Sequence, residues 1–366
     1  MTAQNPSENI RLRATLASLP PYVPGRPAAD DDLVRYKVSS NESPFPALPA
    51  VRDALIAQID GINRYPDMGA VALREELGRM HHVDPAQIVV STGSVAVTGD
   101  LVRALVDQGD DVVFPWRSFE AYPILVGSHG GVGVGVPLGA DHALDLDALA
   151  DAIGERTRLV LLCTPNNPTG PALTAEQIEG FLARVPDTVV VAIDEAYREF
   201  LDPEIAPDTG AIFAAHPNVV LLRTFSKIHG IAGLRIGYAV AHPRLARALS
   251  QVTLPFGAAT LAQAAALACL RPAARAELEQ RAALIRAERH RVLAALRAQG
   301  WEVPDSQGNF VYLPLGGRSQ EFAAFADARG LVVRAYGEDG VRITIAETEA
   351  NDRLLEIAED WRSPAS

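Results

Sequence analysis

Between about residues 69 and 240, short apolar runs alternate with longer segments in which apolar positions recur at helical spacing. Helical spacing is found in "AVALREELGRMHH" and "LTAEQIEGFLARV", and the apolar runs are "IVVST", "DVVFP", "RLVLLCTP", "TVVVAIDEAY", "NVVLLRTFS" and "RIGYAVA". These runs lack the polar alternation of a strand with one wet face, so they indicate strands buried on both faces. The pattern predicts an α/β fold, with a mostly parallel sheet and helices on both of its faces.

The pattern changes after residue 241. A helical region rich in Ala, Arg, Glu and Leu continues to about residue 300, and "NFVYLPL", "LVVRAY" and "VRITIA" then predict short strands between helices. This is typical of a smaller α+β unit packed on the first. Near the start, the proline-rich "LPPYVPGRP" and the acidic "DDD" at 30–32 indicate an extended arm. We therefore predict an N-terminal arm at 1–40, a large domain at 41–250 and a small domain at 251–366.

The acidic balance of the chain excludes some classes of partner. Its 366 residues hold 33 basic and 45 acidic side chains, a formal net charge of -12, without a run of basic residues. We therefore expect no binding to nucleic acid or to an anionic membrane. Cys163 and Cys269 stand in apolar surroundings without metal-ligand spacing, which predicts buried thiols in a reducing compartment and no metal site.

The sequence predicts neither an export signal nor a membrane span. The segment 1–20 lacks an apolar core of the signal-peptide kind. The longest apolar segment, residues 254–270, is rich in alanine and shorter than the roughly 20 residues that a spanning helix needs. We expect this segment to form a buried or interface helix, and we expect the protein to be cytoplasmic.

Polar side chains follow three of the predicted strands at the point where each strand ends. Asn167 follows "LVLLC", Asp194 closes "VVVAI", and Lys227 follows "VVLLRTF". The carboxyl ends of parallel strands meet at one edge of a sheet, and ligands bind in the crevice outside them. The sequence therefore predicts a functional site to which all three residues contribute.

Lys227 has neighbours that suit a phosphate group. A lone lysine after a strand is most often a surface residue with its amine in water. Here Thr224 and Ser226 offer hydroxyl donors, and Arg235 offers a planar double donor with full charge. A lysine amine beside a phosphate site suits a Schiff base with pyridoxal phosphate, so we predict that Lys227 binds this cofactor and later moves a proton.

Such a cofactor also needs a carboxylate that keeps its ring nitrogen protonated. Asp194 is the candidate, although a helix N-cap or a strand-end turn is the commoner role of an aspartate at a strand end. Tyr197 of "DEAY" is placed to donate a hydrogen bond to the ring oxygen. Asn167 precedes a proline that restricts its backbone and can aim its amide at the same oxygen, although "CTPNNPTG" could also be a plain turn.

A further phosphate contact is predicted at residues 89–105, "VVSTGSVAVTGDLVRAL", where a strand, a glycine turn and a helix follow one another. Backbone N–H groups at such a helix start bind phosphate without a charged side chain. Gly93, Ser94 and Val95 would form this part of the site; an ordinary strand-to-helix turn explains the segment equally well. The glycines of "GGVGVGVPLG" lack the G-x-G-x-x-G spacing of a dinucleotide loop.

Taken together, these motifs resemble one enzyme family. In chain order they are "SNESPF", "NRYPD", "TPNNPTG", "IDEAYREF", "TFSKIHGIAGLRIGY", "QGNFVYLPL" and "GVRITIA". This set is similar to that of the fold type I aminotransferases, which depend on pyridoxal 5'-phosphate. It most resembles the branch that contains histidinol-phosphate aminotransferase and the actinobacterial aromatic amino acid aminotransferases. The resemblance runs from about residue 16 to the C-terminus.

The resemblance implies a role for each cofactor residue. Lys227 matches the lysine that binds the aldehyde, and Asp194 matches the partner of the ring nitrogen. Asn167 and Tyr197 match the partners of the ring oxygen. Tyr65 matches a tyrosine that reaches the phosphate of the neighbouring subunit, which implies a homodimer with shared active sites. The phosphate cup corresponds to Ser94, Val95, Thr224, Ser226 and Arg235.

One aromatic side chain of "PWRSFEAY" is expected to stack on the flat cofactor ring. The resemblance matches Phe119 to that position. The spacing after the proline is one residue longer than is usual in the family, so Trp116 and Tyr122 remain alternatives. Core packing would also explain any of the three.

The resemblance also implies the substrate end of the site. Arg342 of "GVRITIA" matches the arginine that binds the substrate α-carboxylate or, for histidinol phosphate, the phosphate region of the substrate. The need for a bidentate guanidinium explains why an arginine is used. Asn41 and Asn309 match asparagines at the same end of the pocket. Arg334 matches an arginine that contacts phosphate in histidinol-phosphate enzymes.

The choice of substrate depends on two further comparisons within the resemblance. The segment from Arg334 to Arg342 is shorter than in typical histidinol-phosphate enzymes, and "PWRSFEAYPI" and "SSNESPFPALP" are similar to the aromatic branch. We therefore expect phenylalanine and tyrosine as amino donors and 2-oxoglutarate as the acceptor, with aromatic 2-oxo acids and glutamate as products. Histidinol phosphate is the second candidate. A regulatory module without turnover is disfavoured, because such a chain would be expected to lose Lys227, Asp194 or Arg342.

Overall fold

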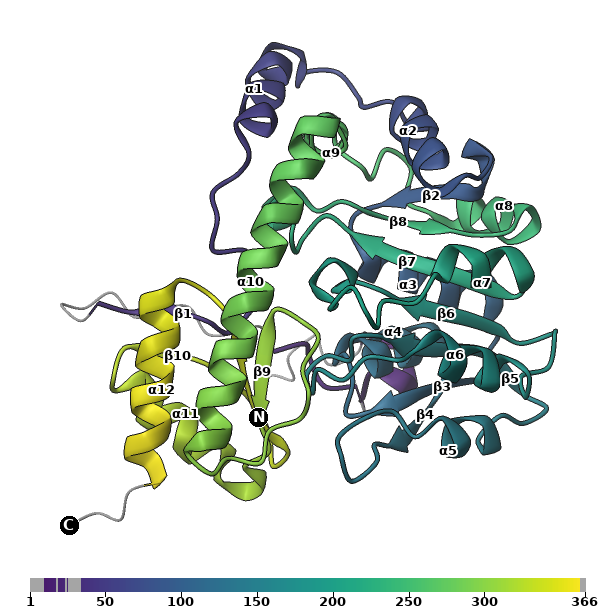
Figure 1. Ribbon diagram of the computed structural model, residues 1–366. Coiled ribbons are helices and arrows are strands. Elements are labelled where there is room, and N and C mark those ends of the chain that lie inside the picture. The colour runs from purple at the N-terminus through teal and green to yellow at the C-terminus, as the bar shows by residue number, and fades with distance from the viewer. Residues whose placement is uncertain (1–9, 18, 24, 26–33, 363–366) are drawn as a thin grey trace, which may run out of the picture.

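The computed structural model describes residues 10–17, 19–23, 25 and 34–362 of the chain. They form a large unit around a seven-stranded sheet and a smaller unit around a three-stranded sheet (Figure 1). Much of the predicted N-terminal arm, including the acidic segment at 30–32, lies outside the described residues. The division of the chain at residues 40 and 250 stays a prediction.

The large sheet has the strand order β2-β8-β7-β6-β5-β3-β4. Strands β3 to β7 are parallel to one another, and β8 is antiparallel to both of its neighbours, β2 and β7. The prediction of an α/β fold with a mostly parallel sheet is confirmed. The strands are β2 (Ile88–Ser91), β3 (Asp111–Trp116), β4 (Val132–Pro137), β5 (Thr157–Cys163), β6 (Val190–Asp194), β7 (Val219–Thr224) and β8 (Gly237–Val240).

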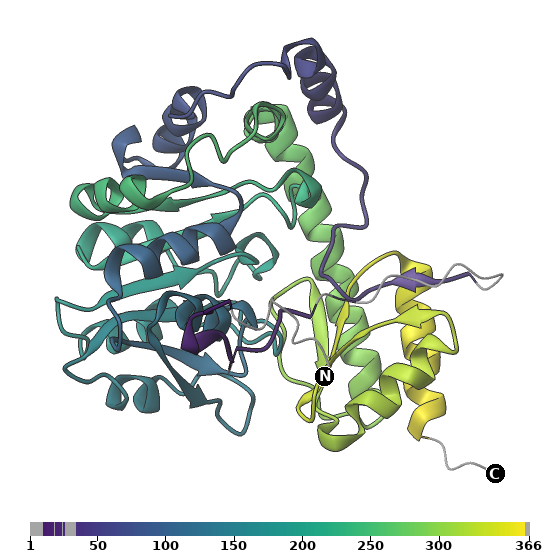
Figure 2. The same ribbon diagram turned by 180° about the vertical axis from the view of Figure 1, so that it is seen from behind.

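Helices cover both faces of this sheet (Figures 1 and 2). Successive residues of a strand point to opposite faces, so Leu161 packs with the helices of one face and Leu162 with those of the other. Because both faces are dry, the strands need apolar residues at consecutive positions, as the sequence shows. One face carries α3 (Ser94–Leu105), α4 (Ala121–His129) and α8 (Pro243–Val252), and the other carries α5 (Leu146–Asp151), α6 (Ala175–Leu182) and α7 (Thr209–Ala215).

Side chains fix where the helices of the second face begin. Asp145, Thr174 and Asp208 each accept a hydrogen bond from a backbone N–H in the first turn of α5, α6 and α7. Such a cap stabilises a helix by ~1 kcal/mol. Short one-turn 3-10 helices connect other elements: η2 (Ala14–Ala17), η3 (Ile59–Gly61), η4 (Pro85–Gln87), η5 (Arg198–Phe200), η6 (Ala232–Leu234) and η7 (Gly316–Arg318).

The glycine-rich segment at 130–139 forms the edge strand β4, for which the sequence pattern gave no prediction. A Cβ on Gly133 would lie 3.1 Å from the ring of Phe114, and a Cβ on Gly135 would lie 3.2 Å from Cβ of Trp116. The two glycines therefore let β4 pair closely with β3 beside bulky aromatic side chains. A strand pattern interrupted by glycine often marks such a close approach.

Helix α9 (Thr260–Cys269) lies in the alanine-rich segment and is largely buried, as the sequence predicts. It packs on α1 (Pro49–Gln58) and α2 (Val71–His81) at one end of the large unit (Figure 1). Cys163 and Cys269 are buried free thiols, which confirms that part of their prediction. Among the helices of the described residues, none has the length and apolar character needed to cross a membrane.

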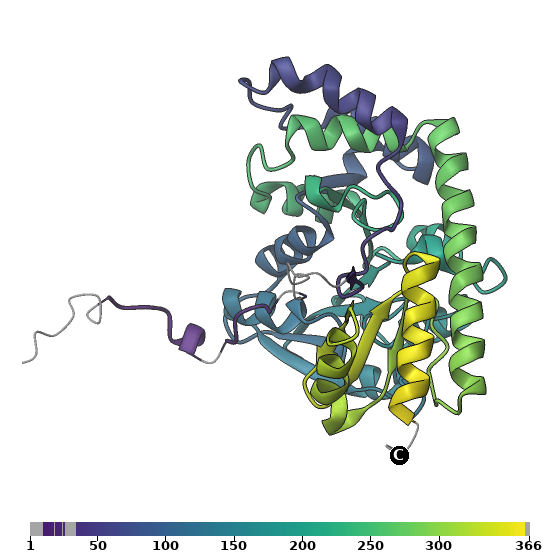
Figure 3. The same ribbon diagram turned by 90° about the vertical axis from the view of Figure 1, so that its left-hand side faces the viewer.

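The small unit is built on an antiparallel sheet of order β11-β12-β9. The long helix α10 (Pro272–Ala298) connects it to the large unit, and α12 (Thr348–Arg362) packs beside α10 (Figure 3). A separate two-stranded sheet pairs β1 (Tyr36–Lys37) with β10 (Leu331–Val332), so the chain just before Asn41 is fixed to the small unit. The remaining elements are β9 (Phe310–Leu313), α11 (Ser319–Asp327), β11 (Arg334–Tyr336) and β12 (Gly340–Thr344).

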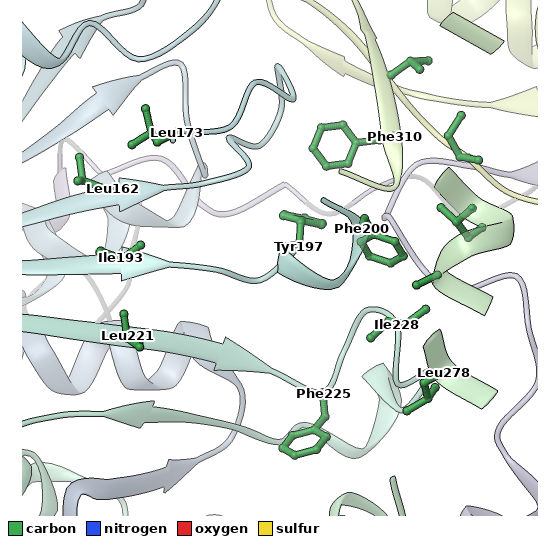
Figure 4. Close-up of a cluster of buried hydrophobic side chains, with 14 of the residues drawn as sticks. Leu162, Leu173, Ile193, Tyr197, Phe200, Leu221, Phe225, Ile228, Leu278 and Phe310 are labelled. Atoms are coloured by element: carbon green, nitrogen blue, oxygen red, sulfur yellow. The ribbon is translucent and has the colours of Figure 1, made fainter. Parts of the chain in front are cut away.

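The apolar cores of the two units are continuous (Figure 4). The core passes from Ile193 and Leu221 in the large sheet to Tyr197 and then to Phe310 of β9. The rings of Tyr197 and Phe310 meet edge to face, with their centroids 5.1 Å apart. The ends of the large-sheet strands are thus held against the small unit, and a site at this junction can use residues from both.

Candidate active site

A cavity of about 230 Å³ lies at the carboxyl ends of β5, β6 and β7. Antiparallel β8 begins at the same edge, because Gly237 pairs with Thr224, and this brings Arg235 to the cavity as well. The cavity contains most of the predicted site residues. Its lining is Ser40, Glu42, Ser94, Val95, Phe119, Cys163, Asn167, Asp194, Ala196, Tyr197, Thr224, Ser226, Lys227, Ala232 and Arg235.

One end of the cavity is formed by the start of α3 and by hydroxyl groups. Ser94 and Val95 are the first two residues of this helix, so their N–H groups have no acceptor within the helix. The Ser226 hydroxyl is 3.0 Å from that of Thr224 and accepts a hydrogen bond of 3.3 Å from Arg235 Nη1. Free N–H groups, hydroxyls and a guanidinium therefore lie together, and such groups suit an anion.

Two glycines let the backbone and Arg235 come together at this end. Gly93, the N-cap of α3, has φ +95°, and a Cβ there would lie 2.7 Å from Arg235 Nη2. A Cβ on Gly237 would lie 2.5 Å from the backbone nitrogen of Ser94. Arg235 itself has φ 53°, in the left-handed region that residues other than glycine seldom adopt. Such backbone strain is characteristic of functional sites.

Asp194 is buried at the end of β6, where its carboxylate has two donors. Tyr122 Oη donates to Oδ2 at 2.8 Å, and the backbone N–H of Ala196 donates to Oδ1 at 3.2 Å. Burial raises the pKa of Asp194 to about 6, although both hydrogen bonds oppose that shift. The carboxylate is therefore ionised near neutral pH, and a cationic ring nitrogen would stabilise it further.

Lys227 follows β7 and its amine points to the carbonyl groups of the 40–41 segment. Nζ donates to the carbonyl oxygens of Ser40 at 3.2 Å and Asn41 at 3.3 Å. Removal from solvent, together with the positive charge of Arg342, lowers the pKa of the Lys227 amine to about 7. A substantial fraction of the amine is thus neutral near pH 7, the form in which it can act as a nucleophile or accept a proton.

Arg342 of β12 approaches the cavity from the small unit. Nη1 donates to Oδ1 of Asn167 at 2.5 Å, and Nη2 donates to the carbonyl oxygen of Ser39 at 2.7 Å. Its Nε is buried without a hydrogen-bond partner among the described residues. All of its acceptors are neutral, so the charge of Arg342 remains available for an anion.

The two predicted asparagines connect the same region. Asn41 Nδ2 donates to Oη of Tyr197 at 3.0 Å, and Asn309 Nδ2 donates to the carbonyl oxygen of Asn41 at 3.2 Å. Asn41 has φ 52°, a left-handed conformation that asparagine tolerates better than most residues. Oδ1 of Asn309 is buried and has no partner within the described part of the chain. Asn41, Asn309 and Arg342 thus adjoin the cavity although none of them lines it.

The three aromatic candidates occupy different places. Phe119 lines the cavity and meets Tyr122 edge to face, with ring centroids 5.6 Å apart. Tyr122 is buried behind Asp194, and Trp116 lies against the guanidinium of Arg117. Of the three, Phe119 has the position from which it could stack on a bound ring.

Two predicted residues lie outside this cavity. Tyr65 is 82% exposed and packs against Phe256, with ring centroids 4.8 Å apart. Arg334 is cross-strand from Arg342 and forms an ion pair with Glu120, with a separation of 2.6 Å. Tyr65 is therefore not part of the cavity lining of its own chain, whereas Arg334 is the cross-strand neighbour of Arg342.

Sequence reasoning missed three features of the site. The hydrogen bond from Tyr122 to Asp194 was not foreseen, although Tyr122 was considered as a stacking residue. The Ser40 carbonyl that contacts Lys227 has no side-chain signature, so no motif could reveal it. Glu120, the carboxylate that pairs with Arg334, is 214 residues away and carries no local signal.

Comparison with known proteins agrees with this geometry. Residues 36–357 match the family model described as aminotransferase class I and II. The aromatic amino acid aminotransferase of Streptomyces avermitilis is 49% identical over 353 residues, which cover 96% of this chain and 98% of that protein. The protein of the same name from Mycolicibacterium vanbaalenii is 49% identical over 355 residues, covering 96% and 99% of the two chains.

A solved structure of an aminotransferase has the same fold as this chain. The histidinol-phosphate aminotransferase from Sinorhizobium meliloti, in complex with pyridoxal-5'-phosphate, superimposes with a TM-score of 0.84 at 29% identity, covering 96% of this chain and 97% of that one. The chain therefore belongs to the aminotransferase class I and II family, with the α/β fold of the fold type I enzymes. It is an aminotransferase. Within the described residues, no group of three or more His, Cys, Asp or Glu side chains is placed to hold a metal ion.

Proposed function

We propose that this aminotransferase uses pyridoxal 5'-phosphate to transfer the amino group of phenylalanine and tyrosine to 2-oxoglutarate. One observation carries the proposal: a single cavity brings together the buried Asp194 carboxylate, the Lys227 amine with its lowered pKa, and the anion site at the start of α3. Aromatic substrates are supported by the names of the relatives at 49% identity.

The residues present fit the cofactor. Lys227 would bind its aldehyde carbon, Asp194 its ring nitrogen, and Asn167 and Tyr197 its ring oxygen. When bound, pyridoxal 5'-phosphate supplies an electron sink that stabilises the negative charge left at the substrate Cα. Phe119 would cover one face of the ring. The cofactor phosphate would lie among Ser94, Val95, Thr224, Ser226 and Arg235.

The chain's own groups would then position the substrate and move its proton. Arg342 would bind the substrate α-carboxylate, for which it has a buried Nε without a partner among the described residues. The carboxylate would meet the amides of Asn41 and Asn309 nearby. Lys227 would take the proton from the substrate Cα, because its pKa of about 7 leaves a neutral amine available.

Replacing Gly237 with alanine is expected to weaken cofactor binding and lower stability. The new Cβ would lie 2.5 Å from Ser94 N and 2.8 Å from the carbonyl carbon of Gly93, both backbone atoms, so β8 or the start of α3 must shift. We expect a loss of ~1–3 kcal/mol in the free energy of unfolding and weaker retention of pyridoxal 5'-phosphate. Denaturant unfolding and a cofactor titration would measure the two effects.

The matched control is Gly180→Ala on α6. Gly180 is exposed, and an added Cβ there meets nothing within 4 Å. Alanine in a helix is favoured over glycine by roughly 0.5–1 kcal/mol, so this variant should be at least as stable as the wild type. Unchanged cofactor affinity in Gly237→Ala would contradict the assignment of the start of α3 to the phosphate.

The experiment that tests the proposed substrate follows the absorbance of the cofactor-loaded enzyme. Phenylalanine and L-histidinol phosphate are added separately, and loss of the aldehyde absorbance is timed over a range of concentrations. Faster conversion at low phenylalanine is the expected result. Faster conversion by histidinol phosphate would instead favour the second candidate, which is supported by the position of Arg334 and by the name of the Sinorhizobium enzyme.

We also infer that the working unit is a homodimer. The exposed rings of Tyr65 and Phe256 pack together, and further exposed apolar side chains occur in the same two segments, 56–71 and 254–256. Large exposed apolar patches mark interfaces. Gln263 ties these segments together by donating to the carbonyl oxygens of Asp67 and Ala258. Light scattering should then give about twice the chain mass of 39.1 kDa. In the segments 56–71 and 254–256 the exposed large apolar residues are Ile56, Ile59, Ile62, Tyr65, Met68, Val71, Leu254 and Phe256.

The cytoplasmic location of the protein stays a prediction.

A further inference from the structure

Glu120 is the N-cap residue of α4, but its carboxylate does not cap the helix. The shorter side chains of Ser, Thr, Asp and Asn are the usual caps, so the Glu120 carboxylate is free to reach another partner. Glu120 instead accepts from Nη2 of Arg334 at 2.6 Å, across 214 residues of sequence. The side chains are 24% and 10% exposed, so their charges are only partly screened by water.

This ion pair stands next to the proposed substrate site. Glu120 directly follows Phe119, which lines the cavity. Arg334 is the cross-strand partner of Arg342, and both guanidinium carbons lie over the ring of Tyr336, at 5.4 and 5.6 Å from its centroid. Arg334 is therefore a neighbouring cation of Arg342, the arginine that would bind the substrate carboxylate.

The arginines around Tyr336 differ in how their charge is balanced. Arg334 faces Glu120, and Arg117, 5.8 Å from the same ring, faces Asp339. Arg342 has only neutral acceptors, the amide oxygen of Asn167 and the carbonyl oxygen of Ser39. Of these three cations, Arg342 is thus the one without a carboxylate partner among the described residues, and it lies beside the cavity.

We propose that Glu120 is a specificity-determining residue that favours substrates with a carboxylate over substrates with a phosphate ester at the same end. A carboxylate carries one negative charge, which the single charge of Arg342 balances. A phosphate is longer by one methylene and an ester oxygen and carries nearly two charges, so it would extend toward Arg334, where Glu120 repels it. This inference rests on the proposed function and adds the residue that sets the choice between its two candidate substrates.

The test compares Glu120→Gln with the wild type, both loaded with cofactor, on ligands that share a phenyl ring. L-Phenylalaninol, L-phenylalanine and L-phenylalaninol phosphate have head-group charges of 0, -1 and nearly -2. L-Histidinol phosphate is added as a second phosphate ligand. Dissociation constants are taken from the change in cofactor absorbance. Glutamine keeps the shape of Glu120 and can still accept from Arg334, so the variant removes mainly the charge.

We expect the gain in affinity to rise with the charge of the head group. Relative to the gain for phenylalaninol, the phosphate ligands should gain about tenfold or more, because a like charge a few ångströms away is removed. Phenylalanine should fall in between. An equal change for all head groups, or no gain for the phosphates, would overturn the proposal. Glu120→Ala is the second variant, since it removes the same charge without the amide.

Glu279→Gln is the matched control. Glu279 also pairs with an arginine at 2.6 Å, Arg286, but lies on α10 and does not line the cavity. The change in affinity caused by Glu279→Gln should not depend on the charge of the head group. Failure of the proposed function and failure of this inference give different results. If the wild type does not convert phenylalanine, the proposed function is contradicted. The inference is tested separately, by whether Glu120→Gln raises the affinity for L-histidinol phosphate.

Discussion

Transamination should fall by about 10⁴-fold or more when Lys227 is replaced with alanine. The variant loses both the amine that would bind the cofactor aldehyde and the base that would take the proton from the substrate Cα. No other lysine lines the cavity described here. The rate of the half-reaction with phenylalanine, measured by stopped-flow absorbance, gives the effect directly. Turnover near the wild-type rate would sink the proposed mechanism.

A stability measurement separates this loss from misfolding. In the cofactor-free chain the pKa of Lys227 is lowered to about 7 from 10.5, mainly by burial. Between these values the unfolded chain binds a proton that the folded chain does not, so the penalty from Lys227 is full below about pH 7 and fades as the pH rises to 10.5. Cofactor-free Lys227→Met should therefore melt above the wild type at pH 6, and the difference should shrink at pH 10.

Arg342 gives the second large effect. Relative to the wild type, Arg342→Lys should lower kcat/KM for phenylalanine about 10- to 100-fold and Arg342→Ala about 10³-fold, because a charged hydrogen bond contributes roughly 1.5–3 kcal/mol and lysine cannot form a bidentate pair. Most of the change should appear in KM, since the carboxylate is bound both before and during the reaction. Steady-state kinetics over a range of phenylalanine concentrations measure both parameters.

The control for this series is Arg184→Lys. Arg184 forms ion pairs with Asp147 and Asp151 on the surface, and exposed pairs of this kind contribute little to stability. Its kinetic constants should match those of the wild type. If Arg342→Ala kept the wild-type KM for phenylalanine, Arg342 could not be the group that binds the carboxylate.

The sequence predicted the large sheet well because burial on both faces leaves a strong signal. Continuous apolar runs such as "VVLLRT" have few alternatives to a buried parallel strand. The edge strand β4 left no such signal, because its residues are mostly exposed and its glycines serve the contact with Phe114 and Trp116. The pairing of β1 with β10 was also invisible, since strands of two residues have no detectable period.

The site was predictable where side chains follow buried strands. Asp194 and Lys227 were placed at one edge of the sheet by topology alone, and they line one cavity. Long-range contacts were not accessible in the same way: one donor to Asp194 is Tyr122, and one acceptor for Arg334 is Glu120. Such pairs depend on tertiary packing, and no spacing along the chain encodes them.

The order of the elements along the chain has a consequence for synthesis on the ribosome. All seven strands of the large sheet, and every side chain of the cavity, have been made once the ribosome passes Val240. Arg342 belongs to β12, about a hundred residues later. Because domains generally fold as units, N-terminal part first, a nascent chain can assemble the proposed cofactor pocket before Arg342, the proposed substrate anchor, exists.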